Sequence, residues 1–166
     1  ALRKQSDWRA LVLFSPFFGI TYGHSLLFLL ASFLNRVSPK SVWKNPIQPM
    51  FLTHDQAEVE RYKQDPLIQR MITSRMAYEI FRGCVSIRAR AKEISLPLLL
   101  LKGGEDHISS VKEAKVFFER TSSRQKQIKI YPHCFHELLH EEERKKVVAI
   151  LREYLTNMGL YQNTDK

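Results

Sequence analysis

Residues 96–106 read LPLLLLKGGED, and this stretch decides the fold. Its four consecutive leucines form an apolar run that is short for a helix and lacks the alternation of a strand with one side in water. Such a run is typical of a strand covered on both faces, as in a parallel sheet. Two glycines and two acidic residues then end it, because these residue types favour turns. We therefore expect an α/β fold built on a buried parallel strand.

Two further strands are predicted, one on each side of this stretch in the sequence. Residues 11–14 form a second apolar run, closed by a Ser-Pro pair, and residues 127–131 alternate until a proline stops them. Residues 110–113 have the pattern of a capping box, which opens a helix, and a last helix is expected from about residue 141 to residue 155. Alternating strands and helices predict a parallel sheet of about three strands with right-handed crossovers.

Residues 21–95 form a predicted helical block that is too long to be a crossover. Residues 25–34 are almost continuously apolar, and a capping-box pattern from Thr53 to Gln56 starts a polar helix that ends before residue 65. A third helix is expected from apolar residues spaced four apart between Ile68 and Ile80, with Gly83 near its end. We therefore predict a core formed by residues 1–20 and 96–166, with residues 21–95 inserted as a helical cap. Residues 1–5 are expected to be the tail of a helix.

Composition and charge exclude several classes of protein. The 166 residues are 44% hydrophobic and 26% charged, which is typical of a globular chain. The longest apolar stretch, around residues 26–34, is far shorter than the ~20 residues that cross a bilayer. The net charge is +9, and residues 36–95 hold eleven bases against six acids, a balance of +5. A basic stripe within this region suits an anionic membrane surface, whereas the lack of interleaved aromatic residues predicts no nucleic-acid partner. The stripe comprises Arg82, Arg88, Arg90 and Lys92.

The two cysteines indicate a reducing compartment. Cys84 and Cys134 are 50 positions apart, too few for a disulfide framework and without C-x-x-C spacing. We predict a cytoplasmic protein that can lie peripherally at a membrane. Cys134 is interpreted as a packing residue rather than a nucleophile, because nothing in the sequence marks a lowered pKa.

Two titratable residues follow two of the predicted strands. Asp106 comes after the strand at 96–101, and His136 comes after the strand at 127–131. In an open parallel sheet, catalytic groups lie just beyond the carboxyl ends of the strands. The order Asp then His matches the second half of a Ser-Asp-His triad, in which Asp orients the imidazole and His removes the serine proton. We therefore predict that Asp106 and His136 work together.

These segments resemble the C-terminal half of the monoacylglycerol lipase and lysophospholipase branch of the α/β-hydrolases, of the serine aminopeptidase S33 type. The resemblance is carried by residues 96–106 with 110–119, by residues 128–137 (IKIYPHCFHE), and by residues 52–82, which are similar to the cap of that branch. It implies a serine hydrolase that cleaves lipid-like carboxylic esters through an acyl-enzyme, without a cofactor. It also implies Asp106 as the triad acid and His136 as the general base.

The nucleophile of that family lies in a G-x-S-x-G motif, and the sequence contains no such motif. The resemblance places the serine about ten residues before Ala1, and a start at Ala instead of Met fits a shortened chain. We therefore expect the chain to be inactive alone. A truncated, non-catalytic binding module is the rival hypothesis.

Ser25 is an alternative nucleophile. Residues 23–25 copy the first three letters of the motif, and the order Ser25, Asp106, His136 agrees with the triad. However, Leu27 stands where the second glycine belongs, and its side chain would crowd the sharp turn. The sequence therefore favours Ser25 as a residue at the entrance to the cap.

His136, Glu137 and His140 spell H-E-x-x-H, the motif of zinc peptidases. That motif requires both histidines on one helix, with a third ligand further along the chain. His136 follows Pro132 by only four residues, which favours a loop, so we expect no metal at this position. The expected partners are a lipid-like ester, a membrane surface contacted through the apolar segment 25–34, and a second copy of the chain.

Overall fold

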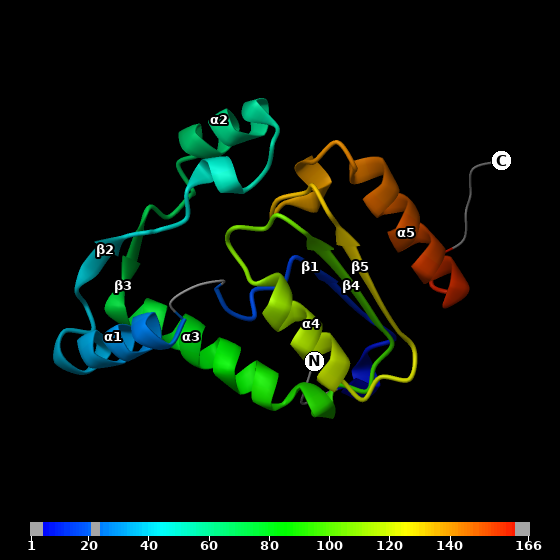
Figure 1. Ribbon diagram of the computed structural model, residues 1–166, viewed down its shortest axis with the longest axis horizontal. Helices are drawn as coiled ribbons and strands as arrows, with labels where there is room; N and C mark the ends of the chain where they lie inside the picture. Colours follow the sequence, from blue (N-terminus) through cyan, green and yellow to red (C-terminus); the bar gives the residue numbers. More distant parts are fainter. Residues whose placement is uncertain (1–4, 21–23, 162–166) are drawn as a thin grey trace.

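The computed structural model describes residues 5–20 and 24–161 (Figure 1). Three strands form a parallel sheet in the order β1-β4-β5, comprising β1 (Leu11–Phe14), β4 (Leu98–Gly103) and β5 (Lys126–Tyr131). All six residues of the central strand β4 are buried, as expected for a strand covered on both faces. The predicted α/β class and the three-stranded parallel sheet are confirmed.

Helices α4 (Val111–Arg120) and α5 (Arg144–Asn157) cover opposite faces of this sheet. Alternate residues of β4 point to opposite sides, so that Leu99 and Leu101 pack in the cluster that includes Val147 of α5. Leu100 packs in the other cluster, with Phe117 of α4. The core therefore has two apolar layers, one on each side of β4.

Polar contacts fix both ends of α4. The Ser110 hydroxyl accepts a hydrogen bond from the Glu113 amide at 3.2 Å, as the capping-box pattern predicts. At the other end, the Lys126 ammonium donates to the carbonyls of Phe118 (2.8 Å) and Glu119 (3.0 Å) and lies 5.0 Å from the Phe118 ring. A cation at a helix C-terminus satisfies free carbonyl groups and complements the helix dipole.

A second group of elements lies beside the sheet (Figure 1). Helix α1 (His24–Val37) packs against α3 (Ser74–Ala89), where the Phe28 and Tyr78 rings stack with centroids 5.9 Å apart. Strands β2 (Val42–Lys44) and β3 (Met71–Thr73) form an antiparallel pair, and α2 (Gln56–Gln64) lies between them in sequence. Short 3₁₀ turns complete the described elements, at Gln5–Asp7, Pro49–Phe51, Ala91–Glu93 and Leu138–His140.

The third helix begins later in the chain than predicted. Ile68 precedes strand β3 and Ile72 lies in it, paired with Trp43, so the four-residue spacing reflects no helix there. The helix begins only after Thr73, whose hydroxyl accepts from the Met76 amide at 3.1 Å. Gly83 lies inside the helix, which continues to Ala89. Pairing with a strand 30 residues away overrides the local pattern in this segment.

The ends of two other elements also differ from the predictions. The N-cap of α2 is Asp55, which accepts from the Ala57 amide at 2.9 Å. Thr53, the predicted cap, instead donates its hydroxyl proton to the His140 carbonyl at 2.7 Å. The last helix begins at residue 144 rather than 141. Of the predicted helix tail at residues 1–5, only Gln5 is described, and it lies in a 3₁₀ turn.

Candidate active site

Asp106 and His136 meet at the carboxyl ends of β4 and β5. The two strands run in register to Gly103 and Tyr131, and each of these residues is followed by a short loop that carries one of the predicted pair. The His136 Nδ1 atom lies 2.7 Å from the Asp106 Oδ2 atom. The structure therefore brings together the two residues that the sequence singled out.

Two glycines allow the loops to approach this closely. A Cβ atom added to Gly103 would lie 1.9 Å from the Phe135 carbonyl oxygen, and one on Gly104 would lie 2.6 Å from the Pro132 carbonyl oxygen. The backbones also bond directly, because the Gly104 amide donates to the Tyr131 carbonyl at 2.7 Å. The Gly-Gly pair therefore lets the His136 loop pack closely against the Asp106 loop, as well as ending the strand.

The Asp106 carboxylate is fully buried and bonded through both oxygens. Oδ1 accepts from the amides of Ile108 (2.8 Å) and Ser109 (2.9 Å). Oδ2 accepts from the Ser109 hydroxyl (2.9 Å), from His136 Nδ1 and from the Lys102 ammonium. Burial alone would raise the pKa of Asp106, but the hydrogen bond from His136 and the charge of Lys102 outweigh it and hold this pKa well below its ordinary value. The carboxylate is thus fixed and ionised.

Lys102 and Ser109 are the site residues that sequence reasoning missed. Lys102 is the fifth residue of β4, it is 0% exposed, and its ammonium contacts both Asp106 and the Ser109 hydroxyl. Burial lowers the pKa of Lys102, and the Asp106 carboxylate opposes this shift. The sequence held one signal for this pair, namely a lysine that directly continues an apolar run. A fully buried lysine is rare without a paired acid, so such a lysine indicates that an acid lies nearby.

His136 is positioned to transfer a proton at the edge of this cluster. Its side chain is 23% exposed, so it reaches solvent while Asp106 beneath it does not. A carboxylate only accepts hydrogen bonds, so Nδ1 carries a hydrogen, and in the neutral imidazole Nε2 is then the nitrogen with a free lone pair. Within residues 5–20 and 24–161, no group hydrogen-bonds to Nε2. This geometry suits a general base held in one tautomer by a buried acid.

The H-E-x-x-H letters do not form a zinc-peptidase helix in this structure. His136 lies in a loop, and Leu138–His140 is a single 3₁₀ turn. The two histidines bond different carboxylates, since His140 Nδ1 lies 2.6 Å from Glu137 Oε2 while His136 binds Asp106. In the described part of the chain, no group of three or more His, Cys, Asp or Glu side chains is arranged to hold a metal.

Ser25 and the two cysteines are the other candidates from the sequence. Ser25 is the second residue of α1, and its side chain lies outside the described residues, as do residues 21–23 before it. The cysteines Cys84 and Cys134 are buried and unpaired. Burial, with a contribution from Glu143, raises the pKa of Cys134 to about 12, so its thiol is a poor nucleophile.

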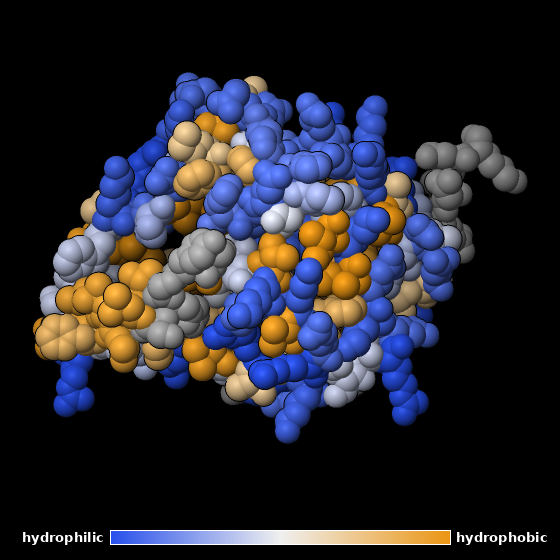
Figure 2. Space-filling view, in the orientation of Figure 1, coloured by the Kyte–Doolittle hydropathy of each residue, from blue (hydrophilic) through white to orange (hydrophobic). Residues whose placement is uncertain are grey.

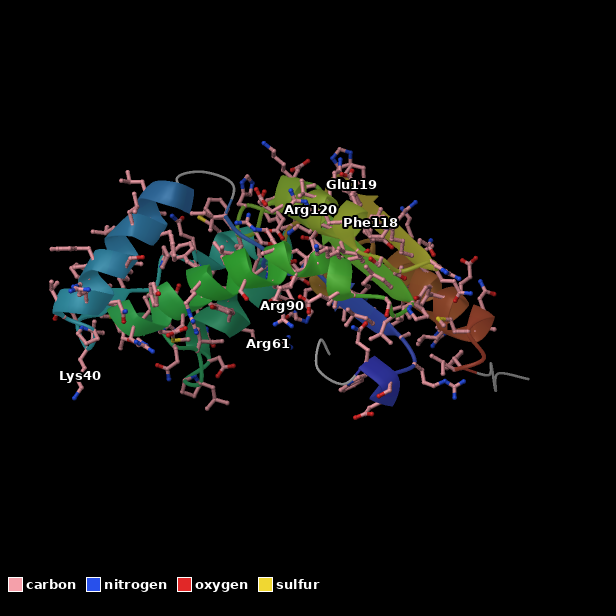
Figure 3. All side chains as sticks on the ribbon, turned by 90° about the horizontal axis from the view of Figure 1, so that it is seen from below. Lys40, Arg61, Arg90, Phe118, Glu119 and Arg120 are labelled. Atoms are coloured by element: carbon pink, nitrogen blue, oxygen red, sulfur yellow. The ribbon has the colours of Figure 1, made fainter. Side chains whose placement is uncertain are left out.

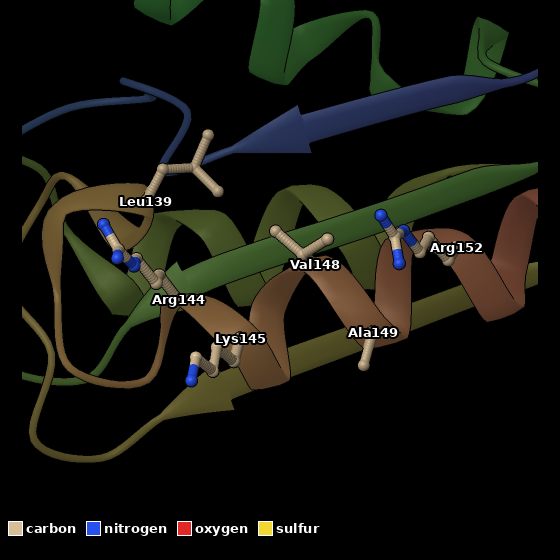
Figure 4. A pocket seen from close by; sticks show the side chains of 6 residues that line it. All are labelled: Leu139, Arg144, Lys145, Val148, Ala149 and Arg152. Carbon is tan, nitrogen blue, oxygen red and sulfur yellow. The ribbon is translucent and has the colours of Figure 1, made fainter. Parts of the chain in front are cut away.

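The basic stripe is largely neutralised by acids. Arg82 pairs with a glutamate on its own helix, Arg88 pairs with Glu113, and Arg90 pairs with Glu93 at 2.7 Å. Figure 3 shows that the Arg90 side chain projects outward from the ribbon. A pocket of about 680 Å³ lies elsewhere, along α5, where Val148 is half-buried (Figure 4). Its lining is basic and aliphatic and holds no acid, histidine or hydroxyl, comprising Leu139, Arg144, Lys145, Val148, Ala149 and Arg152.

Comparison with known proteins decides the family. The model of the family described as "Serine aminopeptidase, S33" matches residues 1–143. The chain belongs to this family. It is 28% identical to human monoglyceride lipase over 99% of its own length and 54% of that protein, and 26% identical to a monoacylglycerol lipase of Mycolicibacterium smegmatis over 93% of its own length and 56% of that protein. The chain thus spans about half the length of these curated relatives.

Solved structures confirm the α/β-hydrolase fold. The monoacylglycerol lipase of Paleococcus ferrophilus matches with a TM-score of 0.86 at 24% identity, over 95% of this chain and 62% of that one. A soluble variant of the Saccharomyces cerevisiae monoglyceride lipase, in complex with a substrate analogue, matches with a TM-score of 0.81 at 16% identity, over 94% of this chain and 55% of that one. At these identities the likeness concerns the fold, and the three-stranded sheet is the C-terminal part of it.

Proposed function

We propose that this chain supplies the acid and the base of a serine hydrolase that cleaves the ester bond of monoacylglycerol-like lipids. The observation that carries the proposal is the Asp106–His136 pair, joined at 2.7 Å beyond the carboxyl ends of neighbouring parallel strands. The relatives named monoglyceride lipase support the class of substrate.

The proposed reaction has two halves. His136 Nε2 takes the proton of a serine hydroxyl as the serine oxygen attacks the ester carbonyl carbon, and it then gives this proton to the departing glycerol oxygen. The acyl group is now bound to serine. In the second half, His136 takes a proton from water as the water oxygen attacks the acyl carbonyl, and it returns the proton to serine as the fatty acid leaves. Asp106 keeps Nδ1 protonated throughout and stabilises the imidazolium.

We propose that the serine comes from a G-x-S-x-G segment outside these 166 residues. A fluorophosphonate probe, which labels activated serines, is then expected to leave this chain unlabelled. Labelling that is lost in Ser25→Ala would instead identify Ser25 as the nucleophile. A coding sequence that holds no such motif upstream would favour the non-catalytic binding module.

The roles of the pair can be tested in a form of the protein that carries the motif. His136→Ala is expected to lower kcat for a short-chain ester by about 10⁴-fold or more, as for other triad members. His133→Ala is the matched control, because His133 lies on the same loop with an 83% exposed side chain and pairs only with Glu105 among the described residues. Equal activities of the two variants would reject His136 as the base.

We further propose that α1 contacts a lipid surface. Six of its apolar side chains are exposed, and they gather in the orange area at the left of Figure 2, comprising Leu26, Leu27, Leu29, Leu30, Phe33 and Val37. With 14 residues, α1 is ~21 Å long against a ~30 Å hydrocarbon core, and no described helix has the length and apolarity of a membrane span. A peripheral position on a cytoplasmic membrane face fits this surface and the unpaired cysteines.

Vesicle flotation tests the surface of α1. The chain is expected to float with phosphatidylcholine vesicles, and Leu29→Glu with Phe33→Glu is expected to abolish this. Because the arginines of the stripe are paired, we expect little further binding to vesicles that also contain phosphatidylserine. A concentration-dependent dimer, seen by sedimentation and lost in the same double variant, would assign α1 to a second copy of the chain instead.

A further inference from the structure

Glu141 is a buried carboxylate that takes no part in the Asp106–His136 pair. Its side chain is 2% exposed, and a charge in such a place must be compensated by donors. Its Oε1 atom accepts from the Phe135 amide at 3.0 Å and from the His54 amide at 3.3 Å. Its Oε2 atom lies 3.0 Å from His54 Nδ1. One carboxylate therefore joins the segment before α2 to the loop that carries His136.

His54 also contacts that loop through its ring. The imidazole stacks on the Phe135 ring with centroids 3.7 Å apart, while its Nδ1 atom donates to Glu141. Phe135 immediately precedes His136 in the chain. Its backbone amide is held by Glu141 and its ring by His54, so the residue next to the proposed general base is fixed from two sides.

Two further hydrogen bonds join the same segments. The Glu137 amide donates to the Leu52 carbonyl at 2.8 Å, and the Thr53 hydroxyl donates to the His140 carbonyl at 2.7 Å. Helix α2 begins immediately after this segment, capped by Asp55. The beginning of α2 is therefore bonded to the His136 loop on both sides of His136, so it cannot shift without moving this loop or breaking the bonds.

We infer that Glu141 and His54 are positioning residues that hold His136 over Asp106 and make its placement depend on the segment that leads into α2. The inference deepens the proposed function, since it rests on His136 as the base. A displacement of α2 would then reach the base through these bonds. Neither residue touches the reacting atoms.

Nuclear magnetic resonance of the chain as it stands tests this inference. The hydrogen between His136 Nδ1 and Asp106 is expected to give a downfield proton resonance, and exchange of the Phe135 amide with deuterium reports its bond to Glu141. In Glu141→Ala we expect loss or displacement of the His136 resonance and an exchange rate higher by about tenfold, the effect of losing one charged hydrogen bond. Glu142→Ala, an exposed neighbour, is the matched control and leaves both unchanged.

Three more variants separate positioning from general damage to the fold. Glu141→Gln keeps an acceptor for the Phe135 amide, so exchange of this amide is expected to be slow, as in the wild type. This variant also keeps the test usable if Glu141→Ala does not fold. His54→Phe keeps the stacked ring but loses the bond to the carboxylate, and Thr53→Val loses the bond to His140. Each of these two is expected to displace the His136 resonance although neither changes the His136 loop itself.

The inference is overturned if Glu141→Ala and Thr53→Val, both folded by circular dichroism, give the same His136 resonance as Glu142→Ala. These measurements need neither an ester nor a nucleophile. An inactive catalytic serine or a non-ester substrate would therefore defeat the proposed function while leaving this result unaffected.

Discussion

Replacing Lys102 by methionine tests the buried charge cluster beneath His136. Methionine has nearly the length of lysine but carries no charge, so Lys102→Met removes the ammonium and leaves the Asp106 carboxylate buried. Removing one partner of a buried pair costs about 3–5 kcal/mol, because the other charge stays uncompensated. Asp106 keeps four donors in the variant, namely two amides, the Ser109 hydroxyl and His136. We therefore expect a loss near the lower end, about 3 kcal/mol of the free energy of unfolding at pH 7.

The same variant has a characteristic pH dependence. The pKa of Asp106 in the folded chain lies below its ordinary value, so the stability that it contributes is fully present above the unfolded pKa of about 3.9 and is lost as pH falls through the folded value. Without Lys102 the folded pKa rises towards or above the unfolded one, so this contribution shrinks or reverses. The difference in the free energy of unfolding between wild type and Lys102→Met is therefore expected to become smaller below pH 4.

Urea unfolding followed by circular dichroism, at pH 7 and at pH 3, measures both effects. Lys112→Met is the matched control, because Lys112 is exposed on α4, and it is expected to change the stability by less than about 0.5 kcal/mol. A Lys102→Met variant as stable as Lys112→Met at pH 7 would refute the buried ion pair. A constant difference across the two pH values would refute the linkage to Asp106.

Three further substitutions test features outside this cluster. Gly103→Ala is expected to destabilise the fold by about 1–3 kcal/mol, because its Cβ would meet the Phe135 carbonyl. Gly83→Ala lies in open space inside α3 and is expected to stabilise the fold by about 0.5–1 kcal/mol. Thermal melts of the two variants measure both effects. Asp55→Ala removes the N-cap of α2 and is expected to cost about 1 kcal/mol, measured by urea unfolding. With its pKa raised to about 12, the Cys134 thiol is expected to resist iodoacetamide at pH 8 in the folded chain and to react once urea unfolds it.

The sequence predicted those features whose signal is local. Four leucines identified β4, and the positions of Asp106 and His136 after two strands placed them at one edge of the sheet. Strand β3 was missed because it pairs with β2, some thirty residues earlier, and a three-residue strand leaves hardly any periodicity of its own. For the same reason Glu141 could not be identified, since its donors come from a loop and from a segment almost ninety positions away.

Lys102 was missed for a different physical reason, and this affects how Asp106, the proposed triad acid, should be tested. Lys102 directly continues an apolar run, but a lysine near a strand end normally extends to water, so the run alone does not show that the Asp106 loop closes over it. Lys102 and Asp106 together carry no net charge, so Asp106→Asn leaves an unpaired buried ammonium as well as an unoriented imidazole. A loss of activity in Asp106→Asn therefore combines instability with lost orientation. The double variant with Lys102→Met restores the charge balance, and only the activity that is still missing from it measures what the carboxylate does for His136.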